Sequence, residues 1–164
     1  MIEAARISAP SKTVLYAAAG FSLVAGLVHL WATPEHFGEW WGYGAFFLIS
    51  AAAQVVYAMV LLARPSQKLL LAGIVGNSAI VLLYLVTRTL GIPFFGPEAG
   101  VVEEVGVLDV IATASEAALV IGLCGMLVWR LPRQDRAVML ILALAAGLLL
   151  VHLPHLVLFF RLIF

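Results

Sequence analysis

Charged residues divide this chain into five long apolar runs. The runs cover residues 13–34, 40–63, 69–87, 105–129 and 137–160. The hydrocarbon core of a bilayer is about 30 Å thick, and a helix that rises about 1.5 Å per residue needs about 20 residues to cross it. Each run is long enough, so the sequence predicts an all-α integral membrane bundle of five transmembrane helices. With no soluble segment of useful length, residues 1–164 are expected to form a single multi-pass membrane domain.

The composition agrees with a lipid environment and excludes other classes of protein. Hydrophobic residues make up 64% of the chain and charged residues 11%, whereas a soluble domain is about half apolar and about a quarter charged. A soluble fold would expose large apolar patches, so an ordinary soluble enzyme is excluded. Nine basic and nine acidic residues give zero formal charge. There is no basic stripe for phosphates, and no nucleic-acid partner is expected.

The basic residues predict the orientation. Lys and Arg are retained in the cytoplasmic loops of membrane proteins. With the N-terminus inside the cell, seven of the nine basic residues are cytoplasmic, namely Arg6, Lys12, Arg64, Lys68, Arg130, Arg133 and Arg136. We therefore expect a protein of the cell membrane with a cytoplasmic N-terminus and, after five spans, a C-terminus outside.

Small residues recur within the apolar runs and predict where helices touch. Helices in lipid associate where small side chains let their backbones approach. Such faces carry Gly26 in the first run, Gly73 with Gly76, Gly122 with Gly125, and Ala143 with Gly147. They predict contacts within the chain, with other membrane subunits, or by self-association through the Gly/Ala faces. Gln54 and Asn77 lie inside the runs and are expected to hydrogen-bond to neighbouring helices, because an unpaired amide in hydrocarbon is costly.

Histidines and a carboxylate are predicted to share one layer near the outer face. Counting about 1.5 Å per residue puts His29 about 24 Å above the cytoplasmic face. The same count brings Asp109, His152 and His155 to a similar depth. Ionisable groups inside a span are costly and are functional hypotheses by default. This layer is therefore the candidate site.

Other polar residues surround that layer. Glu116 is expected about two turns deeper than Asp109 on nearly the same helix face, with Thr113 between them. Outside a metal site, Glu116 could be protonated and hydrogen-bonded to Gln54, Asn77 or Tyr57. Glu35 and His36 border the layer from the segment 34–39, which Pro34 and Gly38 predict to be a connecting turn. The Gly- and Pro-rich loop 91–100 is expected to fold over the layer.

Several functions fit this set of residues. His29, Asp109, His152 and His155 could bind a copper, zinc or iron ion, with Glu116, Thr113, His36 and Glu35 around it. His29 and His152 could instead hold a haem b iron axially. A proton or small-solute path is a further hypothesis, and so is a purely structural polar network in a non-catalytic accessory subunit of a larger membrane-bound oxidoreductase. The sequence contains no catalytic motif that indicates a reaction. Its single cysteine, Cys124, is expected to be a core residue.

Overall fold

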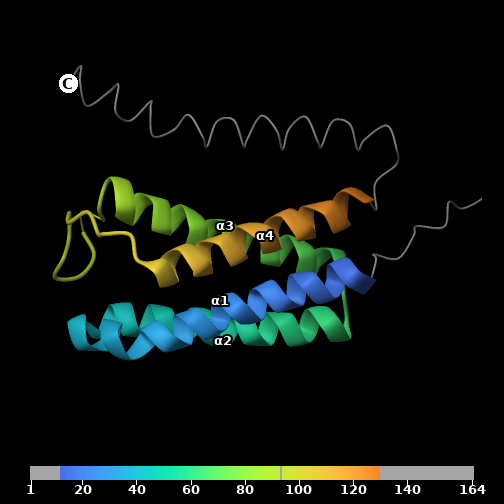
Figure 1. Cartoon of the computed structure of the whole chain (residues 1–164), viewed down its shortest axis with the longest axis horizontal. Helices are drawn as coiled ribbons and strands as arrows, with labels where there is room; N and C mark the ends of the chain where they lie inside the picture. The colour runs from blue at the N-terminus through green and yellow to red at the C-terminus, as the bar shows by residue number, and fades with distance from the viewer. Residues whose placement is uncertain (1–11, 93, 130–164) are drawn as a thin grey trace, which may run out of the picture. The chain divides into compact units, whose positions relative to one another are not determined.

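The computed structural model describes residues 12–92 and 94–129, and these residues form four helices and no strand. The helices are α1 (Lys12–Glu39), α2 (Trp41–Ala63), α3 (Gln67–Thr89) and α4 (Val107–Trp129), and neighbours along the chain run in opposite directions (Figure 1). All four are long and apolar enough to cross a membrane. Four of the five predicted spans are thereby confirmed as helices. The fifth, at 137–160, lies outside the described residues.

The prediction of a turn at 34–39 is wrong, because α1 continues through Pro34 to Glu39. Pro34 removes the backbone donor that would bond the carbonyl of Leu30, a loss that membrane helices tolerate. On either side of Pro34, the Thr33 hydroxyl donates to the carbonyl of His29 at 2.8 Å, and the His36 ring bonds to the carbonyl of Ala32 at 2.9 Å. The helix extends five residues beyond the predicted end.

The connection between α1 and α2 is a single extended residue. Trp40 has φ −165° and ψ 141°, and its N–H still donates to the carbonyl of His36 at 3.0 Å. The next chain reversal, from α2 to α3, ends at Ser66, whose side chain accepts from the Leu69 N–H at 3.2 Å and caps α3. An N-cap serine satisfies a backbone donor that a helix start leaves free.

The loop between α3 and α4 folds back on the end of the α1–α2 pair. Gly91 has φ +70°, and a Cβ there would lie 2.7 Å from the carbonyl oxygen of Val101, so the turn requires glycine. Farther along the loop, the Phe95 carbonyl accepts from the Tyr43 hydroxyl at 3.0 Å, and the Phe95 ring packs edge-on against Trp40. These contacts hold the loop close to the start of α2.

Helices α1 and α2 form the closest pair in the described bundle. A Cβ added to Gly26 would lie 3.0 Å from the Cβ of Gln54 and 3.2 Å from the carbonyl oxygen of Ala51. The absence of a side chain at Gly26 therefore lets the two backbones approach. This close approach confirms the prediction that Gly26 marks a helix contact.

The hydrophobic core fills the end of the bundle that carries Lys12, Arg64 and Lys68, which we call the basic end. Its buried members come from α1, α2, α3 and α4, namely Ala18, Leu61, Leu70, Leu119, Leu123 and Met126. The opposite end carries Glu35, Glu39, Glu98, Glu103 and Glu104 and is called the acidic end. The basic half of the described helices is thus closed by packed apolar side chains.

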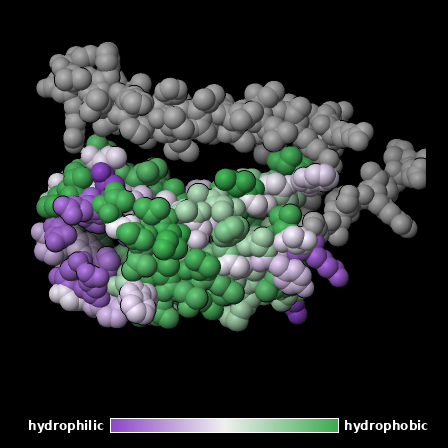
Figure 2. Space-filling view, viewed as in Figure 1, coloured by the Kyte–Doolittle hydropathy of each residue, from purple (hydrophilic) through white to green (hydrophobic). Residues whose placement is uncertain are grey.

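The outside of the helices is apolar. Large side chains such as Ile49, Val75 and Ile121 are about two-thirds exposed or more. Figure 2 shows hydrophobic side chains over the middle of the described helices and hydrophilic groups at both ends, more of them at the acidic end. An apolar surface this extensive is not compatible with water as the main solvent. Together with the length of the helices, it indicates a membrane protein.

Candidate functional site

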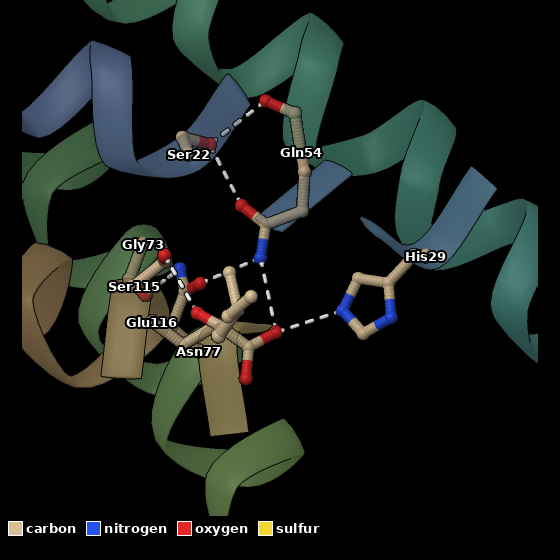
Figure 3. A network of polar contacts seen from close by, with 8 residues as sticks. Ser22, His29, Gln54, Gly73, Asn77, Ser115 and Glu116 are labelled. Atoms are coloured by element: carbon tan, nitrogen blue, oxygen red, sulfur yellow. Dashed lines mark hydrogen bonds and ion pairs between the residues drawn. The ribbon is translucent and has the colours of Figure 1, made fainter. Parts of the chain in front are cut away.

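Five polar side chains from all four helices meet in the middle of the bundle (Figure 3). They are Ser22 and His29 from α1, Gln54 from α2, Asn77 from α3 and Glu116 from α4, and all are buried. Since lipid offers no water to satisfy such groups, each must find a partner within the protein. The network therefore joins all four described helices by polar contacts in the interior of the bundle.

A histidine–carboxylate pair lies at the centre of this network. Nε2 of His29 is 2.9 Å from Oε1 of Glu116, and the two residues are only 5% and 1% exposed. Phe47 packs against the His29 ring at 5.6 Å between centroids, in an edge-on arrangement. The second ring nitrogen, Nδ1, is buried and has no hydrogen-bond partner among the described residues. One side of the imidazole is therefore satisfied and the other is not.

Gln54 connects this pair to the other helices. Its Nε2 donates to Oδ1 of Asn77 at 2.7 Å and, over a longer 3.4 Å, to Oε1 of Glu116. The Ser22 hydroxyl lies 2.8 Å from the carbonyl oxygen of Gln54 and 2.7 Å from its Oε1. With a single proton, it donates to one of them at a time. The prediction that Gln54 and Asn77 bond across helices is confirmed, and of the three partners considered for Glu116 the structure shows a bond to Gln54.

A second polar cluster lies closer to the acidic end, around Arg88 of α3. Its guanidinium pairs with Oδ2 of Asp109 at 2.7 Å and with the carboxylate of Glu103. Asp109 also accepts from the backbone N–H of Gly106 at 3.0 Å, which helps to start α4. The ring of Tyr84 lies 5.0 Å from the guanidinium carbon. Arg88 thus ties α3 to the loop and to α4.

A cavity of about 1290 Å³ connects the two clusters. Its walls include His29, Glu116 and Thr113 on the inner side and Arg88 with Asp109 nearer the acidic end. Most of the other lining side chains are aliphatic or aromatic, contributed by all four helices and the loop. The loop lines the cavity from residues 92, 94, 95, 98 and 101–106, in agreement with the expectation that it folds over the polar layer.

Two residues that were predicted to border the site, Glu35 and His36, also line this cavity. They stand on helix α1 and not in a turn. The ring of His36 stacks on Phe47, 3.7 Å between centroids. Its Nδ1 is used by the carbonyl of Ala32. His29 and His36, two turns apart on α1, therefore contact the same phenylalanine.

The structure groups the predicted residues differently from the sequence. His29 contacts Glu116, while Asp109 lies apart from it on Arg88. Because α1 runs on to Glu39, His29 is about 15 Å from the acidic end of α1, and Glu116 is about 14 Å from the start of α4. Counted from the acidic end, the two residues are thus at one depth, whereas the count from the cytoplasmic face puts His29 nearer to the depth of Asp109.

The other two predicted metal ligands, His152 and His155, lie outside the described part of the chain, so their roles stay predictions. Within residues 12–92 and 94–129, no group of three or more His, Cys, Asp or Glu side chains converges. The metal and haem hypotheses therefore depend on residues beyond those described.

Sequence reasoning missed two residues of the site, Ser22 and Arg88. Ser22 stands seven residues before His29, which puts both on one face of α1. Arg88 is the only basic residue at the acidic end of the described helices. A cation at the end of the bundle where the other described charges are carboxylates signals carboxylate partners.

Comparisons with protein-family models, with curated proteins and with solved structures found no match to this chain. The fold and the site define it as a multi-helix membrane protein with a buried histidine–carboxylate pair on the wall of a cavity.

Proposed function

We propose that this chain binds a small, largely apolar molecule in the cavity, and that the His29–Glu116 pair hydrogen-bonds the polar group of that molecule. The observation that carries the proposal is the position of this buried pair on the wall of a cavity of about 1290 Å³. Small-molecule sites are concave and mostly apolar, with a few polar groups that fix the ligand's orientation. The cavity has this combination.

A gain in the stability of the fold does not by itself explain why the bundle contains a buried histidine–carboxylate pair. Taking two ionisable groups out of water costs several kcal/mol, and apolar residues of the same size often stabilise a protein equally well or better. His29 retains a buried nitrogen without a partner among the described residues. A ligand that supplied the missing hydrogen bond would remove this cost, which supports binding at the pair.

The closed basic half favours binding over a path through the described bundle. Between the network and the basic end lie Leu61, Leu70 and Leu119, each with no exposed surface. Such packed apolar side chains offer no polar route. The hypothesis of a proton or solute path therefore has less support than that of a site filled from the acidic end or from the lipid.

The test compares what two variants carry out of the membrane. The full chain is extracted into lipid nanodiscs without detergent, and bound compounds are identified by native mass spectrometry. Ala79→Phe places a ring on the cavity wall, whereas Ala72→Phe makes the same change on α3 away from the cavity. We expect a stoichiometric compound in the wild type and Ala72→Phe that is lost in Ala79→Phe. Equal amounts in both variants, or none in either, would refute the proposal.

A metal ion or haem is the second candidate, and one contact favours it. A histidine that binds a metal through one nitrogen usually bonds its other nitrogen to a carboxylate or carbonyl. His29 has this arrangement, with Nε2 on Glu116 and Nδ1 without a partner among the described residues. Elemental analysis and an absorption spectrum of the purified chain test it. Stoichiometric copper, zinc or iron, or a Soret band, should disappear in His29→Ala and His152→Ala, and full retention in both would exclude the site.

The orientation is part of the proposal. We place the basic end in the cytoplasm and the acidic end outside, in the cell membrane, because Lys12, Arg64 and Lys68 share one end of the described helices. In a Cys124→Ser background, Glu98→Cys should react in intact cells with a maleimide that cannot cross membranes, and Ser66→Cys should not. The reverse pattern would invert the topology. A partner that co-purifies in fixed stoichiometry would support the accessory-subunit alternative.

A further inference from the structure

We propose that the molecule bound in the cavity is an organic cation with an apolar body. This inference rests on the proposed function, since it names the chemical class of the ligand in the same cavity. It is carried by the charge of the cavity, by its aromatic walls and by the two buried groups at its inner side.

The described charges are divided unequally between the cavity and the rest of the protein. All seven Asp and Glu side chains in the described residues line the cavity: Glu35, Glu39, Glu98, Glu103, Glu104, Asp109 and Glu116. Of the four described Lys and Arg residues, only Arg88 lines it. The terminal nitrogens of Arg88 are already paired with Glu103 and Asp109, and its buried Nε has no partner among the described residues. An excess of negative charge therefore remains around the mouth and on the inner wall.

Such a charge distribution favours a positively charged ligand over a negatively charged one. A concave site lined by charges of one sign with low-dielectric walls concentrates the field and attracts the opposite charge. The mouth carboxylates Glu35, Glu39, Glu98 and Glu104 are exposed, so salt weakens their effect. Glu116 is 1% exposed and lies on the inner wall, where screening by salt is much smaller. An anion entering the same cavity would meet more carboxylates than cations, with Arg88 as the one described Lys or Arg on its wall.

The aromatic walls suit an organic cation better than a small hydrated ion. Tyr43, Phe46, Phe47, Phe94 and Phe95 line the cavity, from α2 and the loop. The faces of such rings attract cations, most strongly when water is excluded. Arg88 over the ring of Tyr84, at 5.0 Å, is an example of this contact within the cavity itself. A bare metal ion would leave most of these apolar walls without a contact.

The inner wall supplies an independent sign of a missing partner. His29 lines the cavity, is 5% exposed, and keeps a buried Nδ1 without a partner among the described residues. Beside it, Glu116 offers carboxylate oxygen to a positive group. An imidazole nitrogen and a carboxylate together can accept hydrogen bonds from an ammonium or amidinium head. The apolar body of the ligand would then lie against the aromatic rings toward the mouth.

Two ions with the same apolar body and heads of opposite charge test the assignment. 4-Phenylbutylammonium, whose head can donate hydrogen bonds, and 5-phenylpentanoate are each dialysed against the full chain in phosphatidylcholine nanodiscs, and partitioning into empty nanodiscs is subtracted. We expect saturable binding of the ammonium at one ion per chain and no saturable binding of the carboxylate. Glu116→Gln should weaken ammonium binding by about tenfold or more, because it removes a buried partner of the charge.

Further variants keep the result decisive if Glu116→Gln does not fold. The double variant Glu98→Gln/Glu104→Gln changes only exposed side chains and should weaken ammonium binding by about two- to threefold at low salt and less at high salt. Ala79→Phe should abolish it, and Ala72→Phe should not. Saturable carboxylate binding that Ala79→Phe abolishes would overturn the cation assignment and leave the binding function in place. Absence of saturable binding of either ion would also overturn the cation assignment. The binding function is tested separately by the compound that co-purifies with the chain.

Discussion

The contact between His29 and Glu116 should couple the two residues by about 2 kcal/mol. Nε2 and Oε1 are 2.9 Å apart, within the normal range for a hydrogen bond, and both side chains are almost fully buried. Hydrogen bonds between helices in membrane proteins average about 0.6 kcal/mol. One that involves an ionised group is worth about 1.5–3 kcal/mol. Because this pair is almost fully buried, we expect a value in the range for a hydrogen bond with an ionised group and not the lower average for membrane proteins.

The coupling is measured with a double-mutant cycle. His29→Leu, Glu116→Leu and the double variant are unfolded reversibly in mixed micelles, and the free energy of unfolding is read from loss of helix and of tertiary contacts. Each single variant should lose about 3 kcal/mol, since it leaves the other group buried and unpaired. The double variant should lose clearly less than the sum. A coupling of 2 kcal/mol corresponds to about a 30-fold change in the unfolding equilibrium.

The same cycle can refute the reasoning. A coupling below about 0.5 kcal/mol would mean that the two residues act independently, as expected only for sites without a shared contact. Ser115→Ala serves as the control, because the Ser115 hydroxyl bonds only to the carbonyl of Ile111 in its own helix. Its effect should add to that of His29→Leu without a coupling term.

Three further changes test the architecture in the same unfolding assay. Gly26→Leu should cost about 1–3 kcal/mol by forcing α1 and α2 apart, whereas Gly76→Leu, with no atom within 4 Å of the added Cβ, should cost much less; equal losses would contradict the close approach. Arg88→Met should lower stability by about 2–4 kcal/mol because two carboxylates lose their partner, with Arg88→Lys between it and the wild type. Ser66→Ala should lose about 0.5–2 kcal/mol by removing the cap of α3, and Ser66→Asp should restore most of it; no loss on Ser66→Ala would show that the cap contributes nothing.

Much of the fold could be predicted because lipid imposes strict rules on sequence. Charges bracket the apolar runs, and a span needs a minimum length, so the bounds of α2, α3 and α4 were predicted within two residues. Polar groups in lipid need partners, which is why the roles of Gln54 and Asn77 followed from their positions alone. The fifth predicted span and its site residues lie outside the described residues, so the five-span topology stays a prediction.

The pairing inside the site could not be predicted from depth alone. The rise per residue counted from the cytoplasmic face puts His29 near the depth of Asp109, but it does not give the shift of neighbouring helices along one another or the faces that they turn inward. In the structure His29 lies against Glu116, while Asp109 pairs with Arg88 of α3. The turn predicted at 34–39 is wrong for a different reason, because a membrane helix can continue through a proline.

The close approach at Gly26 determines which wall of the cavity can adapt to different ligands. A helix pair whose backbones touch, joined by a single residue at Trp40, has little freedom to separate or slide. Helices α3 and α4 are joined instead by a loop of 17 residues, 90–106, that itself lines the cavity. Ligands of different length should therefore leave α1 and α2 unchanged. Hydrogen exchange rates and spectroscopic distances should therefore change with the bound ligand mainly in α3, α4 and the loop. The α1–α2 pair would keep one structure for all ligands, while α3, α4 and the loop would adjust to each of them.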